Sequence, residues 1–293
     1  MRTINARSTV HIRKRKLKNL MAHVLVLSVT LFSVAMLFLL VFDVAKKGLP
    51  WINLDFFINF PSRFADKSGI KPALVGSVWI IVLTGLFSIP VGIGAAIYLE
   101  EYAKENWLTR FIKINIANLA GVPSIVYGML GLTIFVRALG FGRSILSGAL
   151  TMALLILPII IVASQEAIRN VPQSIKHGSY ALGASQMQTI FRIVIPYSLP
   201  GILTGIILAI SRALGETAPL LLVGAFSVVS FLPKSVMDPF TVLPIQIYGW
   251  AGKPQAEFRD VAAAAILVLL SLLLASNAVA ILMRNKYQRK VEE

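Results

Sequence analysis

Two ionisable residues, Arg212 and Glu216, interrupt residues 199–224, a stretch that is otherwise apolar and long enough to cross a bilayer. They are four positions apart, so on a continuous helix they would share one face. A charge at the centre of a membrane span costs about 2.5–3.5 kcal/mol, so each residue needs a partner or a water-filled cavity. The pair is therefore a functional-site hypothesis, and the alternative is a self-neutralising pair that only holds helices together.

The composition of the chain is typical of a membrane protein. Of its 293 residues, 57% are hydrophobic and 14% are charged, and the mean hydropathy is +0.78. Soluble domains average about 45–50% apolar and about 25% charged residues, so we predict an all-α polytopic membrane protein. The net charge of +15 predicts contact with anionic lipid headgroups. Nucleic acid is not predicted as a partner, because the sequence has no RNA-binding motif and its basic residues are not interleaved with stacking aromatic residues.

Patterns of catalytic or metal-binding residues do not occur in the sequence. The chain has no cysteine, and its histidines (His11, His23 and His177) are scattered, so no metal site is predicted. Glu100 and Glu101, just beyond the second apolar stretch, are interpreted as a solvated face. Neither a phosphate-binding G-x-x-x-x-G-K-[ST] loop nor a G-x-S-x-G nucleophile motif is present. The sequence therefore predicts a protein that is not an enzyme.

Six stretches with few or no charges are long enough to cross a membrane. With the N-terminus inside, the inner segments hold 17 Lys and Arg residues and the outer segments hold 10, which predicts that both termini are cytoplasmic. A basic run at 13–16 precedes the first stretch, which is longer than a signal-peptide core and lacks a following cleavage site, so it is predicted to be an anchor. The predicted spans are Val24–Phe42, Pro72–Leu99, Ile114–Val136, Ser144–Gln165, Leu199–Gly224 and Val261–Met283.

The spans divide the chain into three parts. Residues 1–71 comprise the basic N-terminus, the first span and an outer loop; residues 72–284 form a five-span core; residues 285–293 are a cytoplasmic tail. Within the core, residues 166–198 form a cytoplasmic loop, and the proline-rich residues 225–260 form an ordered outer excursion. Recurring glycines allow close helix packing or reflect ordinary membrane usage: Gly92-x-Gly94, Gly128-x-x-Gly131 and Gly201-x-x-x-Gly205.

Local patterns in loop 166–198 predict two short helices. Residues 173–182 are predicted to form one helix, which Gly183 ends. Ser185-Gln186-Met187-Gln188 is a capping-box pattern that begins another, which Pro196 is predicted to end. Two helices with an apolar face outside the membrane either fill a groove on a partner or lie on the lipid surface. The apolar residues predicted to share one face of the second helix are Met187, Ile190, Phe191 and Val194.

This loop resembles the signature loop of the permease subunits of ABC importers. That loop contains E-A-A, then a glycine, and after nine further residues I-x-L-P. Gly183 fits this spacing, but the E-A-A positions hold His177-Gly178-Ser179, which lack the acidic residue. In the family the loop couples the permease to the ATP-hydrolysing subunit, so the resemblance implies such a contact here. The implied coupling residues are His177, Gly178, Ser179, Tyr180, Ala181, Leu182, Gly183, Ala184, Ser185, Ile193 and Pro196.

The stretch R-A-L-G-E-T-A-P at 212–219 is similar to the permeases of phosphate-specific importers, and its T-A-P resembles their A-type member. The resemblance implies the MetI-like architecture of type I ABC importers, with Arg212, Glu216 and Thr217 in the substrate path. The guanidinium of Arg212 would neutralise and orient phosphate, because its forked donors match two phosphate oxygens. Glu216 would hold Arg212 in place and keep the empty site near neutral.

The same resemblance implies the partners of the chain. They are a second, C-type phosphate permease, two ATP-binding subunits and an extracytoplasmic phosphate-binding protein, all at the cell membrane. ATP would be used by the partner subunit, and this chain would bind no cofactor. The alternatives are a permease for sulfate or molybdate in the same importer class, and a secondary transporter. A secondary transporter would favour matched interrupted helices in two halves, which the sequence does not show.

Overall fold

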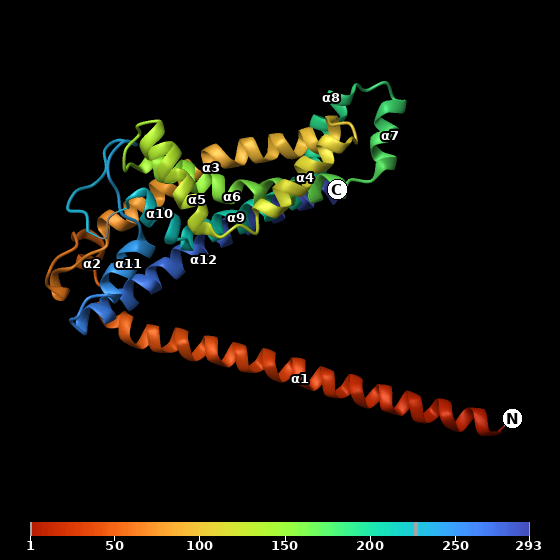
Figure 1. Cartoon of the computed structure of the whole chain (residues 1–293), viewed down its shortest axis with the longest axis horizontal. Helices are drawn as coiled ribbons and strands as arrows, with labels where there is room; N and C mark the ends of the chain where they lie inside the picture. The colour runs from red at the N-terminus through yellow and green to blue at the C-terminus, as the bar shows by residue number, and fades with distance from the viewer. Residues whose placement is uncertain (1, 226–227, 293) are drawn as a thin grey trace.

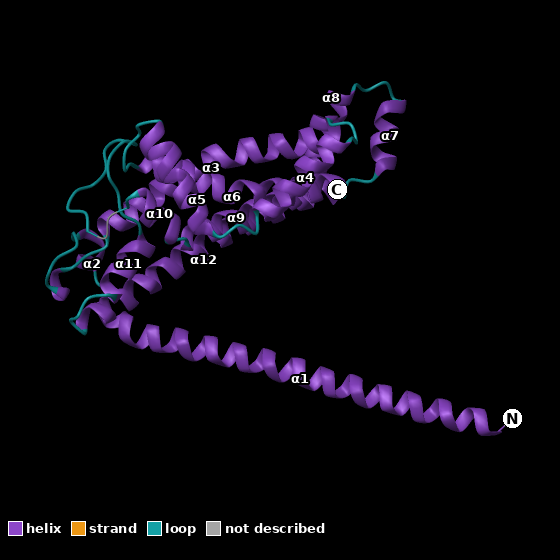
Figure 2. Ribbon diagram, viewed as in Figure 1, coloured by secondary structure: helices purple, strands orange, loops and turns teal. Residues whose placement is uncertain are grey.

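The computed structural model describes residues 2–225 and 228–292, and most of them are helical (Figure 1). Figure 2 shows helices joined by loops, and no β-strand occurs within these two ranges, which confirms the all-α prediction. The ends of the predicted N-terminal segment and tail, residues 1 and 293, lie outside the described residues. The helices are α1 (Arg2–Gly48), α2 (Leu54–Ile58), α3 (Lys71–Ile97), α4 (Trp107–Leu119), α5 (Ser124–Gly131), α6 (Ile145–Arg169), α7 (Gln173–Ala181), α8 (Gln186–Thr189), α9 (Ile195–Gly215), α10 (Ala218–Val223), α11 (Leu243–Ala251) and α12 (Glu257–Glu292).

The described residues hold six candidate spans, as predicted, when the bent pair of helices in the third span is counted as one; the predicted fifth span is also interrupted, after Gly215. Five continuous helical segments are long and apolar enough to cross a membrane, and one bent pair of helices completes the set. Three short π-helical segments extend the spans: Tyr98–Tyr102 after α3, Leu132–Ala138 after α5, and Ile190–Val194 before α9. The continuous spans are Lys18–Trp51, Lys71–Tyr102, Ile145–Arg169, Gln186–Gly215 and Glu257–Lys286.

The core of the bundle lies where α3, α6 and α9 pack together, with α12 along α9 (Figure 1). Ile80, Met152 and Ala209, one from each of the three packed helices, are buried there in one apolar cluster. Small residues allow α9 to approach α6, because a Cβ added to Gly201 would lie 2.7 Å from the Cβ of Ala167. The structure therefore assigns the Gly201-x-x-x-Gly205 pattern to close helix packing.

The third span is not the continuous helix predicted over Ile114–Val136. Its two parts, Trp107–Leu119 and Ser124–Ala138, meet at an angle of 104°. The break follows from Pro123, because proline disfavours helical geometry in the preceding residue and cannot donate a backbone hydrogen bond. Tyr127 fixes the corner, since its hydroxyl donates a hydrogen bond to the Leu119 carbonyl at 2.9 Å.

The prediction that Pro196 ends a short loop helix is also wrong. The helix that begins at Gln186 continues through the π-helical segment Ile190–Val194 into α9 without a break, and Pro196 lies in the first turn of α9. The wide π turn accounts for this, because it replaces the i→i−4 hydrogen bonding that proline would interrupt. The fifth span is therefore rigidly joined to the loop that precedes it.

The predicted outer segments pack together at one end of the bundle. Phe56 of α2 is 4% exposed, and its ring centroid lies 6.2 Å from that of Trp250 of α11. Helices α7 and α8 lie at the opposite end, and the N-terminus of α1 and the C-terminus of α12 also point that way (Figure 1). The bundle thus has two ends, one built from residues 43–71 and the described part of 225–260 and the other from loop 166–198.

Helix α1 stands apart from the bundle. Figure 1 shows that it diverges from the other helices along most of its length and meets them only at its C-terminal end. The contact is made at Gly48, where an added Cβ would lie 2.7 Å from backbone atoms of Ala263 and Ala264 in α12. The apolar stretch Val24–Phe42 is exposed throughout. The prediction of a first span outside the core packing is consistent with this arrangement.

Asp238 holds the turn against which α6 begins, and we expect its contribution to depend on pH. Its Oδ2 atom accepts backbone hydrogen bonds from Lys234 (2.7 Å) and Ser235 (2.9 Å), which hold its pKa below the ordinary value of 3.8. The carbonyl of Asp238 accepts from the Ile145 amide at the N-terminus of α6. Because the folded state favours the charged carboxylate, this stabilisation is present at neutral pH and is lost as pH falls below the ordinary value.

Asp238→Ala should therefore lower the melting temperature of the purified chain at pH 7, and the difference from wild type should shrink at acidic pH. Thermal unfolding in detergent across a pH series measures this. Asp66→Ala, at an exposed position of the same end of the bundle, is the matched control. A difference between Asp238→Ala and wild type that stayed constant across the series would contradict the prediction.

Candidate functional site

Arg212 and Glu216 lie at a break in the fifth span. Helix α9 ends at Gly215, Glu216 has an extended backbone (φ −76°, ψ 131°), and α10 begins after Thr217. The prediction that both residues lie on one face of a continuous helix is therefore wrong. Pro219 accounts for the break, because its ring would clash with the Gly215 carbonyl four residues earlier. The ion pair nevertheless forms, with 3.5 Å between Arg212 Nε and Glu216 Oε1.

The two charged side chains differ in exposure. The Arg212 side chain is 42% exposed and the Glu216 side chain is 19% exposed. Among the described residues, this is the only ion pair that Arg212 makes. Arg212 is thus a cation held by an acid but not enclosed by this chain.

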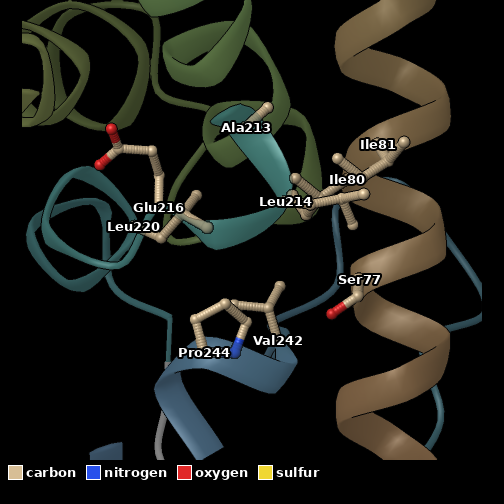
Figure 3. Close-up of a pocket in the computed structure, with 9 residues that line it drawn as sticks. All are labelled: Ser77, Ile80, Ile81, Ala213, Leu214, Glu216, Leu220, Val242 and Pro244. Atoms are coloured by element: carbon tan, nitrogen blue, oxygen red, sulfur yellow. The ribbon is translucent and has the colours of Figure 1, made fainter. Parts of the chain in front are cut away.

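A small cavity beside Glu216 is not a substrate site. Figure 3 shows Ser77 and Ile80 of α3, Leu214 of α9 and Val242 around it, whereas the Glu216 carboxylate points away. The cavity has a volume of about 10 Å³, which is room for one water molecule at most. A phosphate ion therefore does not fit inside the chain at this point. The candidate site is therefore the exposed surface of Arg212 and not this cavity.

The helix break at Pro123 in the third span lies close to the break between α9 and α10. Gly128 of α5, which follows the corner at Pro123, packs against Pro219 of α10, and an added Cβ would lie 2.7 Å from the Pro219 Cα. On the other side, the Ser211 hydroxyl donates a hydrogen bond to Asn277 Oδ1 of α12 at 2.5 Å. Gly128 and Asn277 were not among the predicted site residues. Two interrupted spans therefore meet beside Arg212, and α12 braces the helix that carries it.

Loop 166–198 contains the two predicted short helices. Helix α7 ends before Gly183, which has the left-handed φ of +83° that favours glycine. Ser185 and Gln188 form the predicted capping box at the start of α8. Most of the predicted coupling residues are exposed: His177, Gly178, Tyr180, Ala181, Leu182, Gly183, Ser185 and Pro196. Ala184 and Ile193 are half-buried, and Ser179 is buried.

Of the four residues on the predicted apolar face of the second loop helix, two are buried in the bundle and two are exposed. Ile190 and Val194 are fully buried, whereas Met187 is 62% exposed and Phe191 is 57% exposed. The prediction of one shared face is therefore wrong, because the helix continues into the bundle and turns its buried side towards it. Together with Leu182, which is 91% exposed, Met187 and Phe191 leave apolar groups uncovered at this end of the chain.

The interpretation of Glu100 and Glu101 as a solvated face is wrong. The Glu101 side chain is 7% exposed and pairs with Lys176 of α7, with 2.5 Å between Oε1 and Nζ. The Glu100 side chain is 11% exposed and contacts Lys113 and Arg169, each at 3.1 Å. The sequence gives no signal for these pairs, because Glu101 and Lys176 are 75 residues apart. Over the part of the chain that the structure describes, no cluster of three potential metal ligands occurs.

Comparison with known proteins places this geometry in context. The chain is 34% identical over 267 residues to the phosphate transport system permease protein PstA of Yersinia pestis, covering 91% of this chain and 90% of that one. It is 32% identical to the probable PstA of Methanocaldococcus jannaschii, covering 85% and 87%. The probable ABC transporter permease YqgI of Bacillus subtilis is 40% identical over 174 residues, which is 59% of each chain.

Solved structures with the same fold include chains of two ABC transporters. A chain of a bacterial alginate ABC transporter matches with a TM-score of 0.66 at 13% identity, covering 90% of this chain and 93% of that one. A chain of the MetNI methionine ABC transporter matches with a TM-score of 0.57 at 17% identity, covering 73% and 96%. Residues 88–292 match the family described as binding-protein-dependent transport system inner membrane component, and the chain belongs to this family.

Proposed function

We propose that the chain is the membrane-spanning permease subunit of an ATP-driven importer of inorganic phosphate. The observation that carries the proposal is Arg212, a cation held by Glu216 at a helix break in a chain that is 34% identical to a phosphate permease over nine-tenths of its length. A half-exposed guanidinium in an apolar span is a costly feature, which a translocated oxyanion would explain.

Arg212 neutralises and orients the anion through its forked donors, and Glu216 holds Arg212 and keeps the empty site near neutral. Thr217, at the break between α9 and α10, lines the same path. Because Arg212 faces outward from this chain, a second permease subunit, of the C type, supplies the opposite wall. Similar charges on that wall would complete the coordination of phosphate.

The exposed surface of loop 166–198 is the docking site for the ATP-binding subunits. Leu182, Met187 and Phe191 are large apolar groups at the end of the bundle where a soluble partner would bind, and they suit a groove on that partner. Two such subunits hydrolyse ATP, so this chain binds no cofactor and catalyses no reaction itself. An extracytoplasmic phosphate-binding protein docks at the opposite end, against residues 43–71 and 225–260.

The proposed function implies an orientation in the cell membrane. Loop 166–198 and both termini are cytoplasmic, in agreement with the excess of Lys and Arg in these segments. The anionic lipid headgroups of the inner leaflet contact the same basic segments. Residues 72–284 are the five-helix permease core, and residues 1–71 carry the additional first helix.

Uptake of radiolabelled phosphate tests the function. Cells that lack the gene should regain uptake when the wild-type chain is supplied, and excess unlabelled phosphate should abolish it, whereas sulfate and molybdate should not. Competition by sulfate or molybdate would transfer the substrate assignment to that oxyanion. Uptake that does not depend on the chain at all would overturn the proposal. Dependence on the proton gradient instead of ATP would identify a secondary transporter.

A further inference from the structure

The end of α3 receives both helices of loop 166–198. The last turn of this span, Tyr98–Tyr102, is π-helical, and Glu101 lies within it. The Glu101 carboxylate pairs with Lys176 of α7, and the Glu101 carbonyl accepts a hydrogen bond from Gln186 Nε2 of α8 at 2.5 Å. A single residue of the π-helical segment that follows α3 therefore contacts both α7 and α8, although neither helix is its neighbour in sequence.

Glu101 and Lys176 form a buried contact at the point where α7 leaves the bundle. Their side chains are 7% and 8% exposed. On α7 only Lys176 and Ser179 are buried, and Figure 1 shows the helix standing clear of the membrane-spanning helices. Ser179 bonds to Thr189 at 2.8 Å, which ties α7 to α8. Lys176 is thus the residue through which α7 is held to α3.

The neighbouring glutamate holds the same turn of α3 to the other spans. Glu100 contacts Arg169 at the end of α6, Lys113 of α4 and the Gln165 amide, each at 3.1 Å. Glu100 therefore fixes the π-helical turn within the bundle, while Glu101 faces the loop. A force applied to α7 reaches α3 directly through Lys176, in addition to the covalent connections through α6 and α9.

A buried ion pair is an inefficient way to gain stability, because the cost of removing two charges from water offsets most of their attraction. It does fix one relative geometry of the elements that carry the charges. We propose that Glu101 and Lys176 are positioning residues that transmit movement of loop 166–198 to α3, and thereby couple ATP hydrolysis to transport. This inference rests on the proposed importer function, since the movement originates in the ATP-binding subunits.

The test uses the chain assembled with its partners in lipid nanodiscs for hydrolysis and in proteoliposomes for uptake. Glu101→Gln removes the charge with little change in shape, and Glu105→Gln is the matched control, because the Glu105 side chain is 93% exposed. Glu101→Gln should raise the ratio of ATP hydrolysed to phosphate transported by about 2- to 30-fold, the range found for mutations between coupled sites. Glu105→Gln should leave the ratio unchanged.

The double variant with exchanged charges, Glu101→Lys with Lys176→Glu, distinguishes a positioning role of the ion pair from a general loss of stability in Glu101→Gln. It should restore the wild-type ratio, because the attraction between the two helices is regained with the charges reversed. Failure of the exchange to restore coupling, or to accumulate, overturns the proposal. The proposal is equally overturned if Glu101→Gln matches Glu105→Gln in this ratio.

A second readout needs no substrate and so does not depend on phosphate being the cargo. The chain has no cysteine, so nitroxide labels can be placed at Leu182→Cys on the loop and Trp107→Cys on α4, both highly exposed positions. The distance distribution between the labels in the full chain should broaden in Glu101→Gln and narrow again in the exchanged pair. If Glu101→Gln leaves the distance distribution unchanged, the proposal is overturned. If the label distances respond as expected but the wild type takes up no phosphate, only the substrate assignment is overturned.

Discussion

Arg212→Ala is expected to abolish phosphate uptake while the chain still inserts and assembles. Because the Arg212 side chain is 42% exposed, the loss comes from the missing donors for the anion and not from the energy of the ion pair itself. The effect on transport is enlarged because Glu216 remains 19% exposed and unpaired, and its negative charge then repels the anion. Initial rates of labelled uptake, normalised to the amount of chain that co-purifies with the other subunits, measure this loss.

The double variant Arg212→Ala with Glu216→Gln distinguishes a substrate path from a lock between helices. It removes both charges, so a pair that only stabilised the bundle would be dispensable and uptake would return. If Arg212 binds the anion, the double variant stays inactive although it is assembled. Arg212→Lys should retain partial uptake, because it keeps the charge but loses the forked geometry. Full activity of the alanine variant would exclude Arg212 from the path.

Gly76→Ala is expected to cause the largest loss of stability. Gly76 lies on α3 where the Thr241 carbonyl approaches the helix, and an added Cβ would overlap that oxygen. The neighbouring Ser77 hydroxyl accepts a hydrogen bond from the Leu243 amide at 2.9 Å, so the segment cannot retreat without losing this bond. Overpacking costs about 1–3 kcal/mol, and we expect the upper end because the obstacle is backbone. Thermal unfolding in detergent reports the change.

Gly94→Ala is the control for Gly76→Ala, since it lies on the same helix and has nothing within 4 Å of an added Cβ. Alanine is about 1 kcal/mol more favourable than glycine inside a helix, so Gly94→Ala should leave stability unchanged or slightly raised. Equal melting temperatures for the two variants would show that segment 225–260 does not press on α3 as described.

Most of the fold was predictable because one physical property determines it. A span must bury about 20 residues of backbone in hydrocarbon, so uncharged runs such as 72–99 and 261–283 locate helices without knowledge of their partners. The helix breaks at Pro123 and Pro219 are local effects of proline, and both prolines are visible in the sequence. The apolar run continues through both prolines, however, and hydropathy alone therefore predicted uninterrupted helices at 114–136 and 199–224.

The candidate site was predictable only where its residues are close in sequence. Arg212 and Glu216 are four positions apart, so their pairing could be predicted although the helix between them ends earlier than expected. The pairing of Glu101 with Lys176 could not be predicted in this way, because the two residues come together only when the helices between them have packed. From the sequence alone, the two glutamates at 100–101 are compatible with a solvated surface. Contacts of this kind depend on tertiary structure alone.

The separation of α1 from the bundle follows from the solvent in which this chain resides. In water, the uncovered stretch Val24–Phe42 would drive collapse or aggregation, but acyl chains solvate leucine and valine as well as a protein interior does. Detachment therefore carries no hydrophobic penalty, and attachment requires close packing of small residues. Helix α1 has a single glycine, Gly48, and it is there that the helix touches α12. Over Val24–Phe42, lipid thus replaces protein as the neighbour of α1.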